Sequence, residues 1–239
     1  MMKTRNKTLR IYGILASLFF TLAYPQMGCV LANSYVQGFG IGWLYIHHFV
    51  QLILAIVTIL FITFLSKKKM YDWGLNLNNW QWSLKTASSF AIVWFFISLS
   101  LNLIFNFQSQ LNYEPTTSNI IFDLFFDFIL TGFSEEILFR GLIMGVLLHS
   151  CKGNLNIGNF QISPAGIITT FLFTLAHIGI DYESFTISSI SPLQLIFTMG
   201  LGLFYAIMRD KTKSLLGPII AHGASDGLIT VIQMFIISR

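Results

Sequence analysis

Charged residues are scarce in this chain. Only 10% of its 239 residues are charged, whereas 54% are hydrophobic and the mean hydropathy is +0.70. A soluble domain usually carries about 25% charged residues. Because no long polar segment interrupts the apolar sequence, the composition excludes a sizeable soluble domain and indicates an integral membrane protein.

Cysteine and surplus positive charge are scarce as well. The two cysteines, Cys29 and Cys151, exclude a disulfide framework and form no CxxC pair. The net charge of +4 is small and dispersed, which argues against nucleic acid as a partner. The classes that remain are membrane-embedded enzymes, transporters and membrane-bound binding proteins.

Long apolar runs fill most of the chain. A helix that crosses a bilayer needs about 20 mainly apolar residues. Seven segments are candidates: 11–33, 44–66, 86–107, 120–150, 165–182, 191–209 and 215–237. We therefore predict an all-α fold, a polytopic bundle of about seven transmembrane helices.

Lysine and arginine are distributed unevenly between the loops. They precede the first candidate span and follow the second, fourth and sixth, whereas loops 34–43, 108–119 and 183–190 have none. Because basic loops stay in the cytoplasm, the N-terminus is predicted to be cytoplasmic. The basic start also allows a signal peptide, although the first apolar run is longer than a usual signal sequence.

Half of the ten acidic residues fall inside candidate spans. They are Asp123, Asp127, Glu135, Glu136 and Asp226. Each costs about 2.5–3.5 kcal/mol at the centre of a lipid-facing helix. Together they would cost on the order of 10 kcal/mol, which is comparable with the whole stability of a typical protein. They must therefore face the protein interior or a water-filled cavity, where ionisable residues are usually functional.

Helical spacing separates the two adjacent glutamates. Glu136 and Arg140 are four residues apart and share one helix face, which favours an internal salt bridge that holds the helix in place. Glu135 points about 100° away from Glu136. It lies on a stripe of residues spaced by four, which is expected to line the interior: Asp123, Asp127, Thr131 and Glu135.

Two histidines lie in later spans beside other motif residues. Phe173 and His177 share a face of the fifth span, and His222 and Asp226 share a face of the seventh. A lone membrane histidine usually bridges helices, but two of them together with a separate glutamate favour catalysis. The other histidines are expected at span ends, in the membrane interface: His47, His48 and His149.

The order of these motifs resembles a known family. EExxxR at Glu135–Arg140, FxxxH at Phe173–His177 and HxxxD at His222–Asp226 occur on separate predicted helices. This resembles the CPBP family of intramembrane proteases, also called the Abi or CAAX-protease-like family, which includes the type II CAAX prenyl endopeptidases. The resemblance divides the chain into a two-helix N-terminal segment, 1–69, and a protease core, 70–239.

The resemblance implies an active site of Glu135, His177, His222 and Asp226. By the same analogy, Glu136 and Arg140 orient the helix. The prenyl endopeptidases have Asn where this chain has Asp226. An Asn amide can donate a hydrogen bond to an oxyanion, whereas an ionised Asp only accepts. Asp226 must therefore orient His222, carry a proton or help to bind a metal.

Peptide hydrolysis is the preferred reaction. Glu135 is expected to act as general base on a water that His177 positions, while His222 stabilises the oxyanion. No serine or cysteine is placed as a convincing nucleophile. A zinc ion held by Glu135, His177, His222 and Asp226 stays an open alternative, although HExxH is absent. We favour the metal-free mechanism.

Two rival functions fit part of the pattern. Chains of intramembrane Asp, Glu and His also relay protons in ion-coupled transporters, although no internal repeat is visible here. A non-catalytic immunity or binding protein could keep the fold, although intact motifs argue against it. The expected partners are the lipid bilayer and a membrane-associated peptide or protein, in CAAX-type processing, peptide maturation or bacteriocin immunity. The expected location is a bacterial plasma membrane.

Overall fold

The chain folds into a bundle of helices. The computed structural model describes residues 2–38, 40–66, 69–105, 116–157, 160–181 and 186–237. Within these ranges, five helices are long and apolar enough to cross a membrane: α1 (Met2–Tyr35), α2 (Ile41–Ser66), α3 (Trp80–Phe105), α8 (Pro192–Thr212) and α9 (Leu216–Ile237). The prediction of an all-α polytopic membrane bundle is confirmed.

The predicted fourth span, 120–150, lies in one helical run that two π-helices interrupt. Its parts are α4 (Thr117–Phe125), the π-helix η2 (Phe126–Thr131), α5 (Gly132–Glu136), the π-helix η3 (Ile137–Ile143) and α6 (Met144–Ser150). A π-turn closes i→i+5 hydrogen bonds and is frequent at functional sites. The two adjacent glutamates lie between the two π-helices.

The predicted fifth span, 165–182, is wrong in its extent. Helix α7 (Pro164–Leu175) has only 12 residues and is therefore about 18 Å long, short of the hydrocarbon core. After Leu175 the backbone tightens, because the amides of His177 and Ile178 bond to carbonyls three residues back. The chain then enters the strand β3 (Gly179–Asp181). His177 consequently lies just beyond the helix and not on its face.

Two helices begin at a Ser-Pro pair. The side chain of Ser163 accepts a hydrogen bond from the Gly166 amide at 3.0 Å, and that of Ser191 accepts one from the Gln194 amide at 3.3 Å. Proline follows each serine at the first helical position, where its missing N–H costs nothing. Local sequence thus fixes where α7 and α8 start.

Short antiparallel hairpins complete the described structure. Strands β1 (Leu155–Ile157) and β2 (Phe160–Ile162) pair between α6 and α7, while β3 pairs with β4 (Thr186–Ser189) before α8. Most of the predicted loop 108–119 and the first residues of 183–190 lie outside the described residues.

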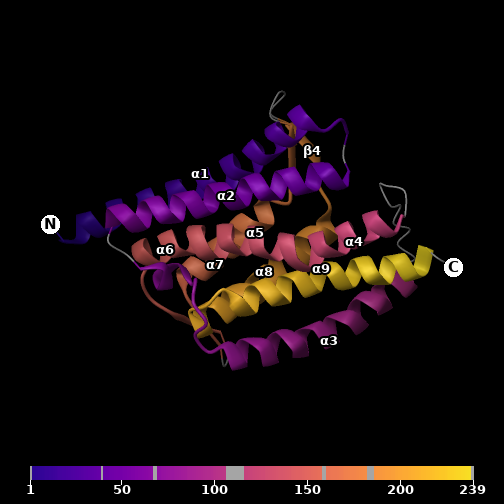
Figure 1. Cartoon of the computed structure of the whole chain (residues 1–239). Coiled ribbons are helices and arrows are strands. Elements are labelled where there is room, and N and C mark those ends of the chain that lie inside the picture. The colour runs from indigo at the N-terminus through magenta and orange to yellow at the C-terminus, as the bar shows by residue number, and fades with distance from the viewer. Residues whose placement is uncertain are drawn as a thin grey trace.

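The helices alternate in direction across the bundle. Figure 1 shows the N-terminus, the ends of α2 and α6 and the starts of α3 and α9 towards the same end of the molecule, at the left. The described basic residues of the predicted cytoplasmic loops lie at or next to helix ends of this kind in the sequence, and Lys211 Nζ lies 4.4 Å from the centre of the Trp82 ring at the start of α3. This arrangement agrees with the alternation read from the sequence.

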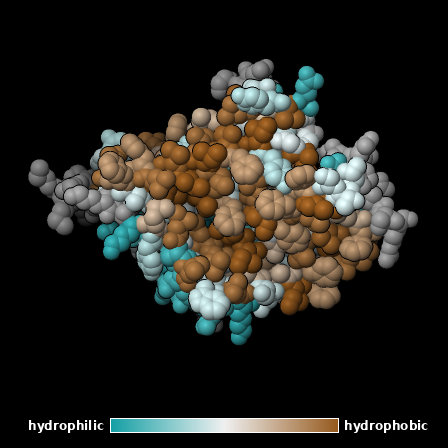
Figure 2. Space-filling model, viewed as in Figure 1, coloured by the Kyte–Doolittle hydropathy of each residue, from teal (hydrophilic) through white to brown (hydrophobic). Residues whose placement is uncertain are grey.

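The surface of the bundle is apolar along its middle. Figure 2 shows hydrophobic side chains over the centre of the visible face. Phe61, Ile104 and Ile196 are examples of large apolar residues that are mostly exposed. A soluble monomer rarely exposes so continuous an apolar surface, whereas a membrane protein presents it to lipid.

The tryptophan-rich segment 71–85 is partly buried inside the bundle. Trp73, in the 3₁₀ turn η1 (Met70–Trp73), is fully buried, and its indole donates to Thr63 Oγ1 at 2.7 Å. The indole lies against Gly145, where a Cβ atom would come within 2.5 Å of it. This tryptophan therefore anchors the segment to α2 and α6 rather than to lipid headgroups.

Candidate active site

Close helix packing brings two of the motifs together. Helix α9 lies against α5 and η2 because both sides lack side chains at the contact. A Cβ atom on Gly132 would lie 2.7 Å from the Ile219 carbonyl oxygen, and one on Gly223 would lie 2.1 Å from that of Phe128. The glutamates of α5 therefore face the first half of α9, where His222 lies.

Glu136 and Arg140 form a buried ion pair across one helical turn. Arg140 Nη1 lies 2.7 Å from Glu136 Oε1, and both side chains are fully buried. Arg140 Nη2 also donates to the Gly202 carbonyl oxygen at 2.9 Å. The guanidinium carbon lies 4.3 Å from the centre of the Phe173 ring and 5.3 Å from that of Tyr205. The pair thus connects η3 to α7 and α8.

The same ion pair holds one edge of His222. The Nδ1–H of His222 donates to Glu136 Oε1 at 2.7 Å. The imidazole stacks on Tyr205, with ring centres 5.0 Å apart and planes 18° apart. Phe173 meets the imidazole edge-on at 5.8 Å. The orientation of His222 is therefore set by Glu136 and two aromatic rings.

Tyr205 is a site residue that sequence reasoning missed. It is fully buried, and its hydroxyl lies 2.9 Å from Ser225 Oγ. Its only sequence signal is a polar aromatic residue in the middle of a predicted span. That signal is weak, since tyrosine also occurs in ordinary apolar cores.

The opposite edge of His222 faces two carboxylates. His222 Nε2 lies 3.4 Å from Asp226 Oδ2 and 3.7 Å from Glu135 Oε2. The side chain of Glu135 is 17% exposed and that of Asp226 is 32% exposed, in contrast to the fully buried Glu136. Glu135 Oε2 is buried and has no hydrogen-bond partner among the described residues. A single water molecule could bridge the gap between this oxygen and Nε2.

His177 joins the site from the end of α7. Its Nδ1 lies 2.8 Å from the Phe173 carbonyl oxygen, so Nδ1–H is the donor and Nε2 is the free nitrogen. The imidazole also contacts the Phe173 ring, with centres 4.7 Å apart. The charges that act on the Glu135 carboxylate include those of His222, His177 and Asp226. All four predicted catalytic residues therefore gather in one place.

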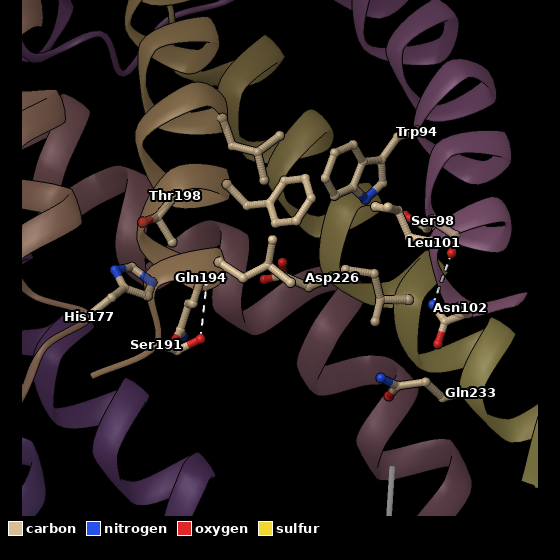
Figure 3. Close-up of a pocket in the computed structure, with 14 residues that line it drawn as sticks. Trp94, Ser98, Leu101, Asn102, His177, Ser191, Gln194, Thr198, Asp226 and Gln233 are labelled. Carbon is tan, nitrogen blue, oxygen red and sulfur yellow. Dashed lines mark hydrogen bonds between the residues drawn. The ribbon is translucent and has the colours of Figure 1, made fainter. Parts of the chain in front are cut away.

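A cavity of about 570 Å³ opens beside this group. His177 and Asp226 line it, together with residues of α3, α8 and α9. Figure 3 shows the Asp226 carboxylate between His177 on one side and Asn102 on the other. A substrate in this cavity would meet the site at Asp226 and His177.

The stripe of acidic residues also faces α9, but only one end reaches the site. Asp127 Oδ2 accepts a hydrogen bond from Thr230 Oγ1, one helical turn beyond Asp226. Thr131 is buried, and its hydroxyl donates to the Phe126 carbonyl oxygen inside the π-helix η2. The hydrogen bond of Asp127 to α9 agrees with the prediction that this stripe lines the interior.

His48 is not interfacial, contrary to the prediction. Helix α2 begins at Ile41, so His48 lies two turns inside it and is only 7% exposed. Its Nδ1 lies 2.7 Å from Ser134 Oγ, next to Glu135. The sequence pattern placed it at a span end because it did not show which face of α2 packs on α5.

The zinc alternative concerns Glu135, His177, His222 and Asp226. Among the described residues, no group of three or more His, Cys, Asp or Glu side chains is arranged to hold a metal ion. His222 Nδ1 is bonded to Glu136 and His177 Nδ1 to a backbone carbonyl, and His222 Nε2 faces the carboxylates of Asp226 and Glu135. We therefore derive no chemical step through a metal.

Comparison with known proteins gives two matches. Residues 117–228 match the family described as type II CAAX prenyl endopeptidase Rce1-like, and all seven motif residues lie in this range. The chain is 26% identical over 160 residues to the membrane-embedded CAAX protease MroQ of Staphylococcus aureus strain USA300. That alignment covers 64% of this chain and 58% of MroQ, less than two thirds of the relative's length. No solved structure matches the chain.

Proposed function

The chain belongs to the CPBP, or CAAX-protease-like, family, and on this premise we propose that it is an intramembrane endopeptidase with Glu135 as its general base. One observation carries the proposal: Glu135 Oε2 is buried, has no hydrogen-bond partner among the described residues and faces His222 Nε2 at 3.7 Å. Leaving a buried carboxylate oxygen without a hydrogen bond is costly, and ionisable residues inside a membrane are usually functional.

In the proposed reaction, Glu135 removes a proton from a water molecule that His177 helps to position. The resulting hydroxide attacks the carbonyl carbon of the scissile peptide bond. His222 carries protons on both nitrogens and donates from Nε2 to the oxygen that becomes negative. When the C–N bond breaks, the proton held by Glu135 passes to the leaving nitrogen. Water is thus divided between a new carboxyl group and a new amine.

Glu136 and Arg140 are positioning residues in this scheme. Because Glu136 accepts the Nδ1–H of His222, it directs Nε2 towards Glu135 and Asp226. Arg140 neutralises Glu136 and is itself held between Phe173 and Tyr205. Asp226 lies nearest to Nε2 and to the cavity, so it keeps the imidazolium in place while substrate enters.

The proposed substrate is a membrane-associated peptide or protein. The name of the relative, a membrane-embedded CAAX protease, supports CAAX-type processing, while maturation of a peptide or immunity to a bacteriocin uses the same chemistry. We further propose that residues 70–239 form the protease core and that residues 1–69 form an N-terminal two-helix segment. The proposed location is a bacterial plasma membrane, as the Staphylococcus relative suggests.

The direct test compares membrane peptides from cells that carry the wild type or Glu135→Gln. Mass spectrometry should find peptides whose cleavage disappears in the variant. Asp123→Asn is the matched control, because it removes another intramembrane carboxylate from the same helical run, three turns away from the site. Identical peptides from wild type and Glu135→Gln, together with altered proton flux, would instead identify a transporter.

A further inference from the structure

The cavity beside the active site has a second wall that the proposed mechanism does not use. This wall is the C-terminal half of α3, and it faces the first turns of α8 and the second half of α9. Figure 3 shows its labelled residues on the far side of Asp226 from His177. On this wall the apolar lining residues are Trp94 and Leu101, and further apolar lining comes from α8 and α9 with Phe197, Leu201 and Ile229.

Two polar side chains interrupt this apolar wall. Ser98 and Asn102 lie one turn apart on α3 and are only 3% and 7% exposed. Ser98 Oγ and Asn102 Oδ1 have no hydrogen-bond partner in the part of the chain that the structure describes. The Asn102 amide is nevertheless fixed, since its Nδ2 donates to the Ser98 carbonyl oxygen at 2.9 Å. Asn102 Oδ1 is therefore left as an acceptor at the cavity wall.

Such unpaired groups point to a ligand. Burying a hydroxyl or an amide oxygen without a partner destabilises a folded protein, and native structures rarely keep such groups without a function. A lipid acyl chain has no donor or acceptor to offer. A peptide unit has both: an N–H for Asn102 Oδ1 and a carbonyl oxygen for the hydroxyl of Ser98.

We propose that Ser98 and Asn102 form a subsite that binds the backbone of an extended substrate peptide. A substrate N–H donates to Asn102 Oδ1, and a substrate carbonyl accepts from Ser98 Oγ–H. The apolar side chains of the same substrate segment pack against Leu101 and Phe197. The inference rests on the proposed protease function and specifies how its site selects a substrate.

The depth of the subsite defines the class of substrate. Asn102 lies 17 residues after Lys85 on the same helix, which places it about 26 Å from the basic end of the bundle. Because α3 ends at Phe105, the subsite lies within this span but near its end opposite to Lys85, and the segment that it binds must enter the bilayer there. A backbone there has no water to bond to, so its polar groups need protein partners. The substrate is thus a hydrophobic, membrane-inserted peptide rather than a soluble cytoplasmic one.

The test uses a quenched fluorogenic peptide with an apolar segment, chosen because the purified wild type cleaves it in detergent. Asn102→Ala should raise KM about tenfold, as expected for one lost hydrogen bond, and leave kcat within about twofold. In a second series, one peptide bond of the substrate at a time is N-methylated. A single position should then show a similar rise in KM. That rise should vanish in Asn102→Ala, because the two changes remove the same contact.

Ser98→Ala separates a ligand contact from a structural one. Because Ser98 Oγ has no described partner, its removal should raise the unfolding temperature while KM rises severalfold. Leu103→Ala is the matched control on α3, because Leu103 is 67% exposed on the outer surface of the bundle and should leave KM unchanged.

Two results would overturn the inference. One is cleavage that depends on Glu135 but has the same KM in wild type, Ser98→Ala and Asn102→Ala. The other is a rise in KM on N-methylation that, at every position of the peptide, adds to the rise in KM caused by Asn102→Ala. If Asn102→Ala does not fold, the KM of Ser98→Ala and the N-methyl series on the wild type still test the inference. Equal peptide cleavage by wild type and Glu135→Gln would refute the proposed function itself.

Discussion

Glu135 and Glu136 are neighbours in the sequence, yet they lie on opposite sides of His222. On the closed side, Glu136 is fully buried and accepts from both Arg140 and His222 at 2.7 Å. On the open side, Glu135 and Asp226 approach Nε2 at 3.7 and 3.4 Å and remain partly exposed. One imidazole thus separates a buried carboxylate from two that are partly exposed, of which Asp226 lines the cavity.

The difference between the two sides of His222 indicates that Glu136 and Arg140 serve stability, whereas Glu135 and Asp226 serve the reaction. The closed side is a charge network held between two aromatic rings, and breaking such a network destabilises a fold. The open side holds groups whose contacts are too long for good hydrogen bonds, as is common in active sites without substrate. Substitutions should therefore affect folding on one side and turnover on the other.

The largest effect is expected on the closed side. Arg140→Ala leaves Glu136 buried without its ion-pair partner, which should lower the free energy of unfolding by about 3–5 kcal/mol. Thermal unfolding of the purified protein measures the loss. Lys152→Ala, at an exposed cation, is the control and should unfold like the wild type. A stable but inactive Arg140→Ala would instead make Arg140 a contact of the substrate.

On the open side, Glu135→Gln should abolish turnover without harming the fold. The loss in kcat is expected to be about a hundredfold or more, equivalent to roughly 2.7 kcal/mol, because the amide cannot accept a proton from water. The unfolding temperature should stay near that of the wild type, since Glu135 Oε2 has no described hydrogen bond to lose. A marked drop in the unfolding temperature would contradict the proposal that the open side serves turnover and the closed side serves folding.

Asp226→Asn should have a milder effect. Asn keeps an acceptor for the hydroxyl of Ser225, which lies 3.2 Å from Asp226 Oδ1, and supplies the residue that the prenyl endopeptidases use. We expect at least a tenth of wild-type activity, a loss below about 1.4 kcal/mol. Bound zinc should be measured on the same samples, because stoichiometric zinc lost together with activity would show that Asp226 is a metal ligand.

The smallest effect is expected for Ser134→Ala. Ser134 Oγ lies 2.7 Å from His48 Nδ1, which has the appearance of a nucleophile and its base. Both side chains are buried, however, and Ser134 does not line the cavity. The substitution should lower stability by about 1 kcal/mol and leave kcat within about twofold of the wild type. Loss of all activity would indicate that Ser134, and not water, is the nucleophile.

The sequence alone determined the membrane class, the alternation of the helices and the motif residues. Each follows from local chemistry: apolar runs long enough for a bilayer, basic loops on one side, and charges too costly for lipid unless they face inward. Spacing by four also predicted that Glu136 and Arg140 share a face. They meet at 2.7 Å although the π-helix η3 begins between them.

Tertiary structure alone decided which groups meet across helices. The stacking of Tyr205 on His222, the burial of His48 and the unpaired oxygens of Ser98 and Asn102 depend on which faces of distant helices pack together. The end of α7 at Leu175 could not be predicted from the sequence either, because an apolar run does not show where the backbone leaves the helix. Periodicity describes one helix at a time, whereas a site is made where several helices approach.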